Sequence, residues 1–223
     1  MKIHFKIHFI TQWGQSIALF VSDGKIDVPK KIEMSCGKNF EWTTSIDIQS
    51  SKKNLFYRYG LENNSSAVEF EYGGYRQLKL DGEFPEIFIS DNWRARYGDS
   101  PFESSAFTDC LFKRKIMYKA PRVKDANLVL RLRCAQLEPN RHFAVIGNQE
   151  ALGNWDVKKK IRLDESDFPV WSIALNATKF KFPLEYKYLI VDTATDEVVA
   201  WGGGPNRVVE SVMKKSLNIF NDE

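Results

Sequence analysis

A weak internal repeat constrains the fold of this chain more than any other feature of its sequence. The two members of each repeated pair of segments are 129 residues apart: 28–32 with 157–161, 42–46 with 171–175, and 55–59 with 184–188. The second pair aligns Trp42 with Trp171, and the third aligns the patterns LFYRY and LEYKY. Three segments that share one register seldom arise by chance, so the sequence predicts two copies of one module.

The repeat and the chain length together predict the domain boundaries. A chain of 223 residues has room for two domains of about 100 residues each. We expect the first module at residues 1–92 and the second at 122–214. The stretch between them, 93–121, is rich in charge and has no regular apolar period, so we expect it to be a connector. The last residues, 215–223, end in polar side chains and predict the start of a linker.

Short runs of apolar residues indicate strands throughout the chain. At the N-terminus Ile3, Phe5, Ile7 and Phe9 alternate with Lys and His, which is the period of a strand with one buried face. Clusters of Gly, Asn, Asp and Ser separate the runs. The expected strands are 2–9, 16–21, 40–48, 55–61, 67–72, 128–134, 142–146, 170–175, 184–192 and 197–201. We therefore predict an all-β fold of two tandem antiparallel immunoglobulin-like β-sandwiches.

The charge balance gives no sign of a polyanionic partner. With Lys+Arg 32 and Asp+Glu 29 the formal net charge is +3, whereas domains that bind nucleic acid have a strong basic excess. Aromatic residues interleaved with Lys and Arg would also suit a groove for single strands, which is a minor alternative. No run approaches the roughly 20 apolar residues that cross a bilayer. We expect neither nucleic acid nor a membrane as a partner.

Cysteine and histidine are too few and too dispersed to predict a metal or redox site. Cys36, Cys110 and Cys134 form no CxxC pair, and the chain has only three histidines. We expect no metal site, no cofactor and no disulfide framework. Widely spaced cysteines favour a reducing compartment, so we expect the protein in the cytoplasm.

The second copy contains a cluster of motifs in a fixed order. It has GNQEALGNW at 147–155, a tryptophan at 171, EYKY at 185–188 and AWGGGPNR at 200–207. In order and spacing this cluster resembles the starch-binding domain of carbohydrate-binding module family 20, with its pattern G-N…L-G-x-W, Trp, [EY]-Y-K-[FY] and W…P-N-R. The resemblance implies a non-catalytic module that binds α-1,4-glucan, such as starch, glycogen or malto-oligosaccharide.

The chemistry of glucose explains why such residues would serve. A glucose ring has faces of C–H groups and a rim of hydroxyls, so a binding site needs flat aromatic surfaces and a few fixed polar groups. The resemblance implies that Trp155 and Trp201 form the stacking platform and that Lys187 and Asn206 hydrogen-bond ring hydroxyls. Trp171 is either a core residue or a contact of a second sugar site, and both readings stay open.

The first copy departs from this pattern. It has Arg58 at the place of Lys187 and Phe70 near the place of Trp201, and it lacks the Gly-Asn-Trp segment. We expect it to bind glucan weakly through Phe70 and nearby tyrosines, to use another surface, or to serve as a spacer.

A wider resemblance covers nearly the whole chain. The segment TQWGQS at 11–16, SAFTD at 105–109 and the tandem modules look like the N-terminal region of 4-alpha-glucanotransferases of glycoside hydrolase family 77, of the plant-cytosolic disproportionating type. In that family two such modules precede a catalytic barrel. The resemblance implies that the parent protein transfers glucosyl units in maltose and glycan metabolism, with that barrel as the partner of this chain in one polypeptide.

We expect no catalytic residues within this chain itself. A (β/α)₈ barrel takes roughly 250 residues in alternating strands and helices, which this sequence does not show. One alternative uses Glu69 and Glu71, whose spacing on a strand could pair two acids as in some β-sandwich glycosidases. Another is an immunoglobulin-like interaction or spacer module that binds no sugar.

Overall fold

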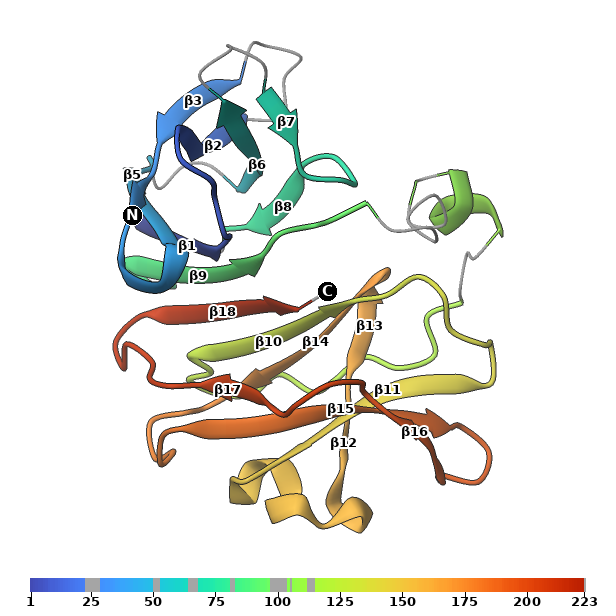
Figure 1. Ribbon diagram of the computed structural model, residues 1–223. Coiled ribbons are helices and arrows are strands. Elements are labelled where there is room, and N and C mark those ends of the chain that lie inside the picture. The colour runs from blue at the N-terminus through green and yellow to red at the C-terminus, as the bar shows by residue number, and fades with distance from the viewer. Residues whose placement is uncertain are drawn as a thin grey trace. The chain divides into compact units, whose positions relative to one another are not determined.

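The computed structural model describes residues 1–22, 29–49, 53–63, 68–80, 83–96, 104, 106–111 and 115–222. Val28 of the first repeated segment, Ala67 of an expected strand, Ser105 and parts of the expected connector lie outside these ranges. The chain divides into two compact units (Figure 1). The first unit is Met1–Pro101 with Lys215–Glu223, and the second is Phe102–Lys214.

Two sheets make up the first unit. One sheet has the order β3-β2-β6-β7, with β8 also paired to β6, and the other has the order β4-β5-β1-β9-β18. The strands are β1 (Lys2–His8), β2 (Gln15–Ser22), β3 (Lys30–Glu33), β4 (Ser35–Cys36), β5 (Glu41–Asp47), β6 (Asn54–Asn63), β7 (Val68–Phe70), β8 (Arg76–Lys79), β9 (Glu86–Asn92) and β18 (Leu217–Asp222). A short 3-10 helix, Lys38–Phe40, precedes β5.

The alternation at the N-terminus forms the expected strand. Ile3, Phe5 and Ile7 of β1 are buried, while the Lys and His residues between them are not. Phe5 packs edge-on against Tyr57 of β6, with 4.9 Å between ring centroids. The core of the first unit therefore lies between its two sheets, as the period-two pattern predicts.

The expected all-β fold of β-sandwiches is confirmed, but two details of the first unit differ from the expectation. β1 pairs with β9 in parallel, and β9 pairs with β18 in parallel, so this sheet is mixed rather than antiparallel. Residues 215–223 do not begin a linker, because Leu217–Asp222 form β18. Ile219 of β18 is buried, and Asn221 donates a hydrogen bond to Asp91. The polar side chains of this tail predicted exposure to solvent, but Asn221 is hydrogen-bonded within the fold.

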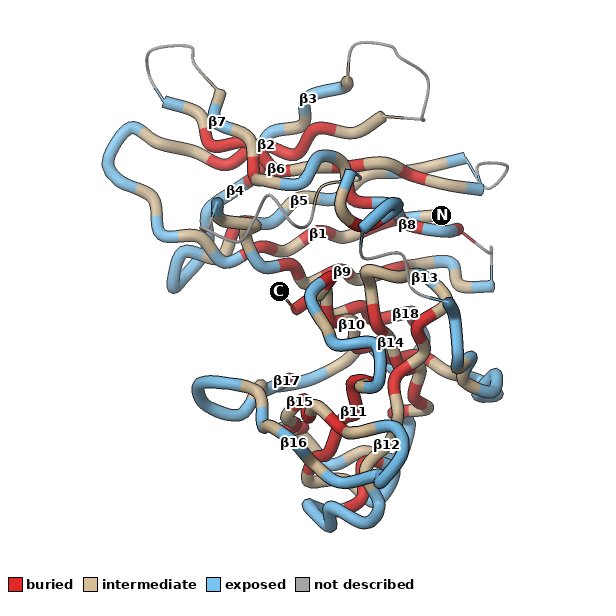
Figure 2. Tube along the Cα trace, turned by 90° about the vertical axis from the view of Figure 1, so that its right-hand side faces the viewer, coloured by how far each residue is buried: buried red, intermediate tan, exposed pale blue. Residues whose placement is uncertain are grey.

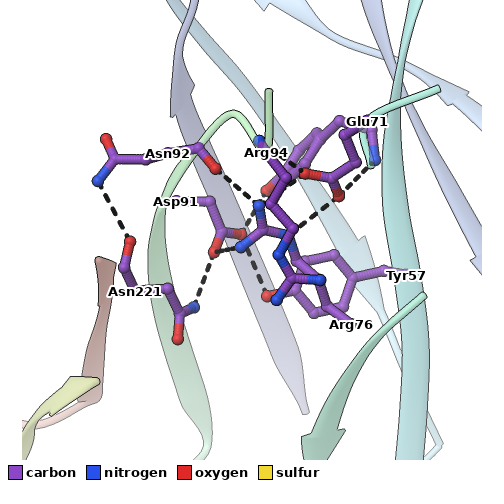
Figure 3. A network of polar contacts seen from close by, with 8 residues as sticks. Tyr57, Glu71, Arg76, Asp91, Asn92, Arg94 and Asn221 are labelled. Carbon is purple, nitrogen blue, oxygen red and sulfur yellow. Dashed lines mark hydrogen bonds and ion pairs between the residues drawn. The ribbon is translucent and has the colours of Figure 1, made fainter. Parts of the chain in front are cut away.

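A buried ionic network links three strands of the first unit (Figure 3). Arg76 contacts Glu71 at 2.6 Å and Asp91 at 3.0 Å, and all three side chains are almost completely inaccessible. Tyr57 and Tyr59 donate hydrogen bonds to Asp91. Burial alone would lower the pKa of Arg76, but the negative charges of Asp91 and Glu71 raise it well above its usual value. Arg76 therefore stays charged inside the fold.

The second unit also has two groups of paired strands. One sheet has the order β12-β11-β15-β16, with β17 also paired to β15, and the other group has the order β13-β14-β10. The strands are β10 (Leu128–Arg133), β11 (Arg141–Gly147), β12 (Ile161–Arg162), β13 (Asp164–Asp167), β14 (Val170–Leu175), β15 (Leu184–Asp192), β16 (Val198–Trp201) and β17 (Arg207–Val209). The short helices are η3 (Phe107–Leu111), η4 (Glu150–Trp155) and η5 (Val157–Lys159). Buried residues concentrate along the strands and exposed residues along the joining loops (Figure 2).

The two units place their repeated tryptophans alike. Trp42 on β5 lies opposite Ile7, and Trp171 on β14 lies opposite Leu132. Each indole N–H donates to a backbone carbonyl two residues beyond that partner, at 3.2 Å for Trp42 and 2.9 Å for Trp171. Both tryptophans are buried. Their role in the described structure is therefore to close the core at the same place in each unit.

The end of the expected connector packs on the second unit. The backbone N–H groups of Met117 and Tyr118 both donate to Oε1 of Glu165, at 2.6 and 2.7 Å. The N–H of Ala120 donates to Asp164 at 2.7 Å. Two neighbouring carboxylates of β13 thus satisfy three backbone donors of this segment, which holds it against the strand.

Candidate functional site

The central strand of the candidate site is β15. Tyr186 and Tyr188 are buried, whereas Glu185 and Lys187 between them are partly exposed. The EYKY motif therefore points its tyrosines into the core and its charged residues to the outer face of the sheet, as the alternation predicts.

Trp201 lies on the outer face beside this strand. It ends β16 opposite Leu189 and is 50% exposed. Leu189 is completely buried in a cluster with Ala144, Ile146 and Val191. The half-exposed indole therefore lies on a strand that pairs with β15, whose residue Leu189 is closely packed.

The turn that joins β15 to β16 is held by side chains. The carboxylate of Asp192 accepts hydrogen bonds from the backbone N–H groups of Ala194 and Thr195, at 2.9 and 3.1 Å. These hydrogen bonds lower the pKa of Asp192 below its usual value of 3.8. Lys160 forms an ion pair with Asp196 at 2.8 Å, which attaches the same turn to the segment after η5.

Polar donors flank Trp201. The ammonium of Lys187 donates to the carbonyl of Gly204 at 2.8 Å, and the amide of Asn206 donates to the carboxylate of Glu185 at 3.2 Å. Both contacts attach the loop after Trp201 to β15. An ammonium has three N–H donors, so the bond to Gly204 leaves Lys187 with donors for a ligand.

Trp155 ends the short helix η4 and is 36% exposed. Gly153, Asn154 and Trp155 have positive φ angles of 80°, 49° and 63° in succession, which turns the chain outward after the buried Leu152. Asn148 anchors the start of this loop, because its side chain accepts from the N–H of Glu185 and donates to the carbonyl of Pro183. The G-N…L-G-x-W motif is thus a loop-shaping element that ends in an exposed indole.

Gly153 is required by this loop on two grounds. Its φ is 80°, and a Cβ there would lie 2.8 Å from the carbonyl oxygen of Lys159. We expect Gly153→Ala to lower the free energy of unfolding of the second unit by about 1–3 kcal/mol, measured by chemical denaturation. Gly203→Ala is the matched control, because nothing lies within 4 Å of its added Cβ. Equal losses in the two variants would contradict this explanation.

The sheet order places the candidate residues around one strand. Lys187 lies on β15, opposite Ile146 of β11, whose chain continues into η4 and Trp155. Trp201 lies on β16, which pairs with the other side of β15 (Figure 1). Trp171 does not join this surface, because it is completely buried in the core. Its inclusion among the candidate binding residues is therefore corrected.

The counterparts in the first unit are arranged differently. Phe70 on β7 lies opposite Gly60, as Trp201 lies opposite Leu189, so the register places Phe70 at the position of Trp201. The guanidinium carbon of Arg58, however, lies over the Phe70 ring at 3.5 Å from its centroid. Phe20 packs against the same ring with 4.9 Å between centroids. The face of Phe70 is therefore occupied by Arg58 rather than open to a sugar.

One exposed aromatic residue was not selected as a binding residue from the sequence. Trp13 lies in the loop between β1 and β2 and is fully exposed. Gly14, with a φ of 81°, and paired contacts between Gln12 and Gln15 form its tight turn. The sequence feature that indicates this exposed residue is a tryptophan directly before a glycine in a short polar loop.

The structure does not favour the alternative in which Glu69 and Glu71 are paired catalytic acids. Glu71 is buried in the ion pair with Arg76, while Glu69 is exposed on β7. The two carboxylates therefore have different environments and do not share an open cleft. Within the described ranges, no group of three or more His, Cys, Asp or Glu residues is placed to hold a metal ion. No helix in that same part of the chain is long and apolar enough to cross a membrane.

Comparisons with known proteins bear on the second unit above all. Residues 127–218 match the family model of carbohydrate-binding module family 20, described as starch binding domain. The chain is 25% identical over 224 residues to a 4-alpha-glucanotransferase of Oryza sativa subsp. japonica, an alignment that covers 91% of this chain and 23% of that enzyme. It is 38% identical over 85 residues to an alpha-amylase of Streptomyces violaceus, covering 37% of this chain and 14% of that enzyme. The chain thus spans less than a quarter of either relative.

Among solved structures, the family 20 carbohydrate-binding module of a maltotetraose-forming amylase from Pseudomonas saccharophila STB07 is 25% identical. It covers 42% of this chain and 97% of its own length, with a TM-score of 0.35. The family match includes every strand of the second unit from β10 to β17. Residues 127–218 therefore match the starch binding domain family, and most of the chain is similar to part of a 4-alpha-glucanotransferase.

Proposed function

We propose that the second unit binds α-1,4-glucan by stacking sugar rings on Trp155 and Trp201. The observation that carries this proposal is the half-exposed Trp201 beside the donors Lys187 and Asn206, within the segment that matches a starch binding domain. Aromatic faces suit the C–H faces of glucose, and fixed donors suit its hydroxyl rim. Because the sugar is neutral, Lys187 acts as a hydrogen-bond donor rather than as a counter-charge.

The expected affinity is modest. Each stacked ring contributes on the order of 1 kcal/mol beyond the buried area, so one site has a dissociation constant of roughly micromolar to millimolar. In the first unit Arg58 covers Phe70, and we therefore assign glucan binding to the second unit rather than to this face of the first.

We further infer that this chain is the non-catalytic part of a cytoplasmic 4-alpha-glucanotransferase, with a catalytic barrel in the same polypeptide. The alignment with the rice enzyme over 91% of the chain supports this inference. In that setting the tandem units would hold an α-glucan near the barrel while maltose or another glycan is processed.

The test is isothermal titration of the 223-residue chain with β-cyclodextrin, a compact mimic of one turn of the starch helix. We expect saturable binding to one site, with the same affinity at low and moderate salt, because no phosphate contacts release counterions. Binding that weakened steeply with salt would favour a nucleic-acid partner instead. No binding at millimolar sugar would favour an interaction or spacer module.

A further inference from the structure

The first unit has a partly buried guanidinium, that of Arg58, which forms no ion pair with a carboxylate of the described residues. The guanidinium carbon of Arg58 lies 3.5 Å from the centroid of Phe70 and 4.6 Å from that of Tyr75. The N–H donors of a guanidinium lie in its plane, so contact with ring faces does not satisfy them. Nε of Arg58 is buried and has no hydrogen-bond partner among the residues that the structure describes. Arg58 is thus held in place by two rings, and no contact with a described residue neutralises its charge.

The acidic residues near Arg58 along the chain either pair with other cations or lie on the opposite face of the sheet. Oε1 of Glu62, on the same strand, contacts the ammonium of Lys31 at 2.6 Å. Glu71 is buried against Arg76. Glu69 pairs with Leu61 in the β6–β7 register, one residue out of step with Gly60 and Phe70, so it belongs to the opposite face of the sheet. The charge of Arg58 is therefore not neutralised by these three carboxylates.

A cation that is half-buried and unpaired is costly unless a ligand neutralises it. Arg76 differs in this respect, because its buried guanidinium is neutralised: it donates to Glu71, Asp91 and the carbonyl of Asn92. Arg58 instead has a planar fork of donors, which matches two oxygens of a phosphate or carboxylate. Phosphate carries about −1.5 to −2 charges at neutral pH, so it gains more from a single guanidinium than a carboxylate does.

We propose that Arg58, held by Phe70 and Tyr75, is a binding site for a phosphate monoester such as that of a sugar phosphate. The register places this site at the position that Lys187 and Trp201 occupy in the second unit. The aromatic face is covered, which removes a platform for a neutral sugar, and the donor is a charged fork. Contact with two rings orders the side chain in advance, which reduces the entropy lost on binding. The proposal does not depend on glucan binding by the second unit.

The experiment is an NMR titration of the whole chain that follows the Arg58 Nε–H signal in nitrogen-edited spectra and the ring signals of Tyr75 in carbon-edited spectra. The probes are inorganic phosphate, glucose 6-phosphate and maltose, each at constant ionic strength set with chloride. We expect saturable shifts with the two phosphates and none with maltose. We expect Arg58→Lys to weaken phosphate binding about tenfold, because an ammonium cannot form the two-pronged contact.

Matched variants separate a site from a general charge effect. Arg58→Gln and Lys2→Gln change the net charge equally, but Lys2 is an exposed residue of β1 in the other sheet. We expect Arg58→Gln to remove the saturable shift of the Tyr75 signals and Lys2→Gln to keep it. Equal losses in both variants, saturation by maltose, or no saturation at millimolar phosphate would overturn the proposal. Thermal unfolding of each variant verifies that the first unit is still folded.

Discussion

Replacing Trp155 and Trp201 together with alanine is expected to weaken β-cyclodextrin binding about 30-fold or more. Each indole contributes on the order of 1 kcal/mol to ring stacking beyond buried area, and 1.4 kcal/mol corresponds to a tenfold change in affinity. Neither side chain belongs to the buried core of the second unit, so we expect the double variant to fold. Isothermal titration measures the dissociation constant, and retention on granular starch gives an independent readout.

The matched control is Ile116→Ala, which removes another exposed apolar side chain of the second unit. Its dissociation constant should equal that of the unaltered chain. The two single variants should each account for part of the loss. Unchanged retention of the double variant on starch would reject the assignment of the platform while leaving the fold intact.

Removing the buried charge of Arg76 is expected to destabilise the first unit by about 3–5 kcal/mol. Arg76→Met leaves Glu71 and Asp91 buried without their cation, and an uncompensated buried charge is far more costly than a lost exposed pair. Chemical denaturation gives the free energy of unfolding. Hydrogen exchange of the first unit's amides should increase, while the second unit keeps its β-cyclodextrin affinity.

Two further variants make this prediction sharp. Lys6→Met breaks a partly exposed pair with Glu41 in the same unit and should cost at most about 1 kcal/mol. The triple change Arg76→Met with Glu71→Leu and Asp91→Leu removes all three charges and should be less destabilised than Arg76→Met alone. If Arg76→Met costs no more than Lys6→Met, the network contributes nothing beyond an ordinary surface pair.

The network also predicts the direction of an alkaline effect. Burial first, and the negative charge of Asp91 second, raise the pKa of Tyr59 well above its usual value of 10.0. Because the folded-state pKa lies above the unfolded one, this contribution to stability is complete below pH 10.0 and falls as the pH rises toward the folded pKa. The first unit is therefore expected to lose this part of its stability only in alkaline solution.

Much of the secondary structure could be predicted because it depends on neighbours along the chain. The alternation around Ile3, Phe5 and Ile7 forms β1. The EYKY motif buries its two tyrosines and leaves its charged residues partly exposed, as a period of two predicts. The residues of β18 were misread, because Asn218 and Asn221 look like solvent-exposed residues in a linker. Asn218 donates to the carbonyl of its near neighbour Ser216, whereas Asn221 contacts Asp91 and Asn92, which only the folded chain brings close.

The sequence by itself determined the strand pattern, the repeat and the motif order that matches a starch binding domain, because these depend on residue type and spacing. Only the tertiary structure decided which aromatic side chains are available. Trp171 is buried against the core, Trp201 is half-exposed, and Phe70 is covered by Arg58. Exposure depends on side chains that meet across strands and loops, and no local pattern encodes where a long arginine side chain will rest.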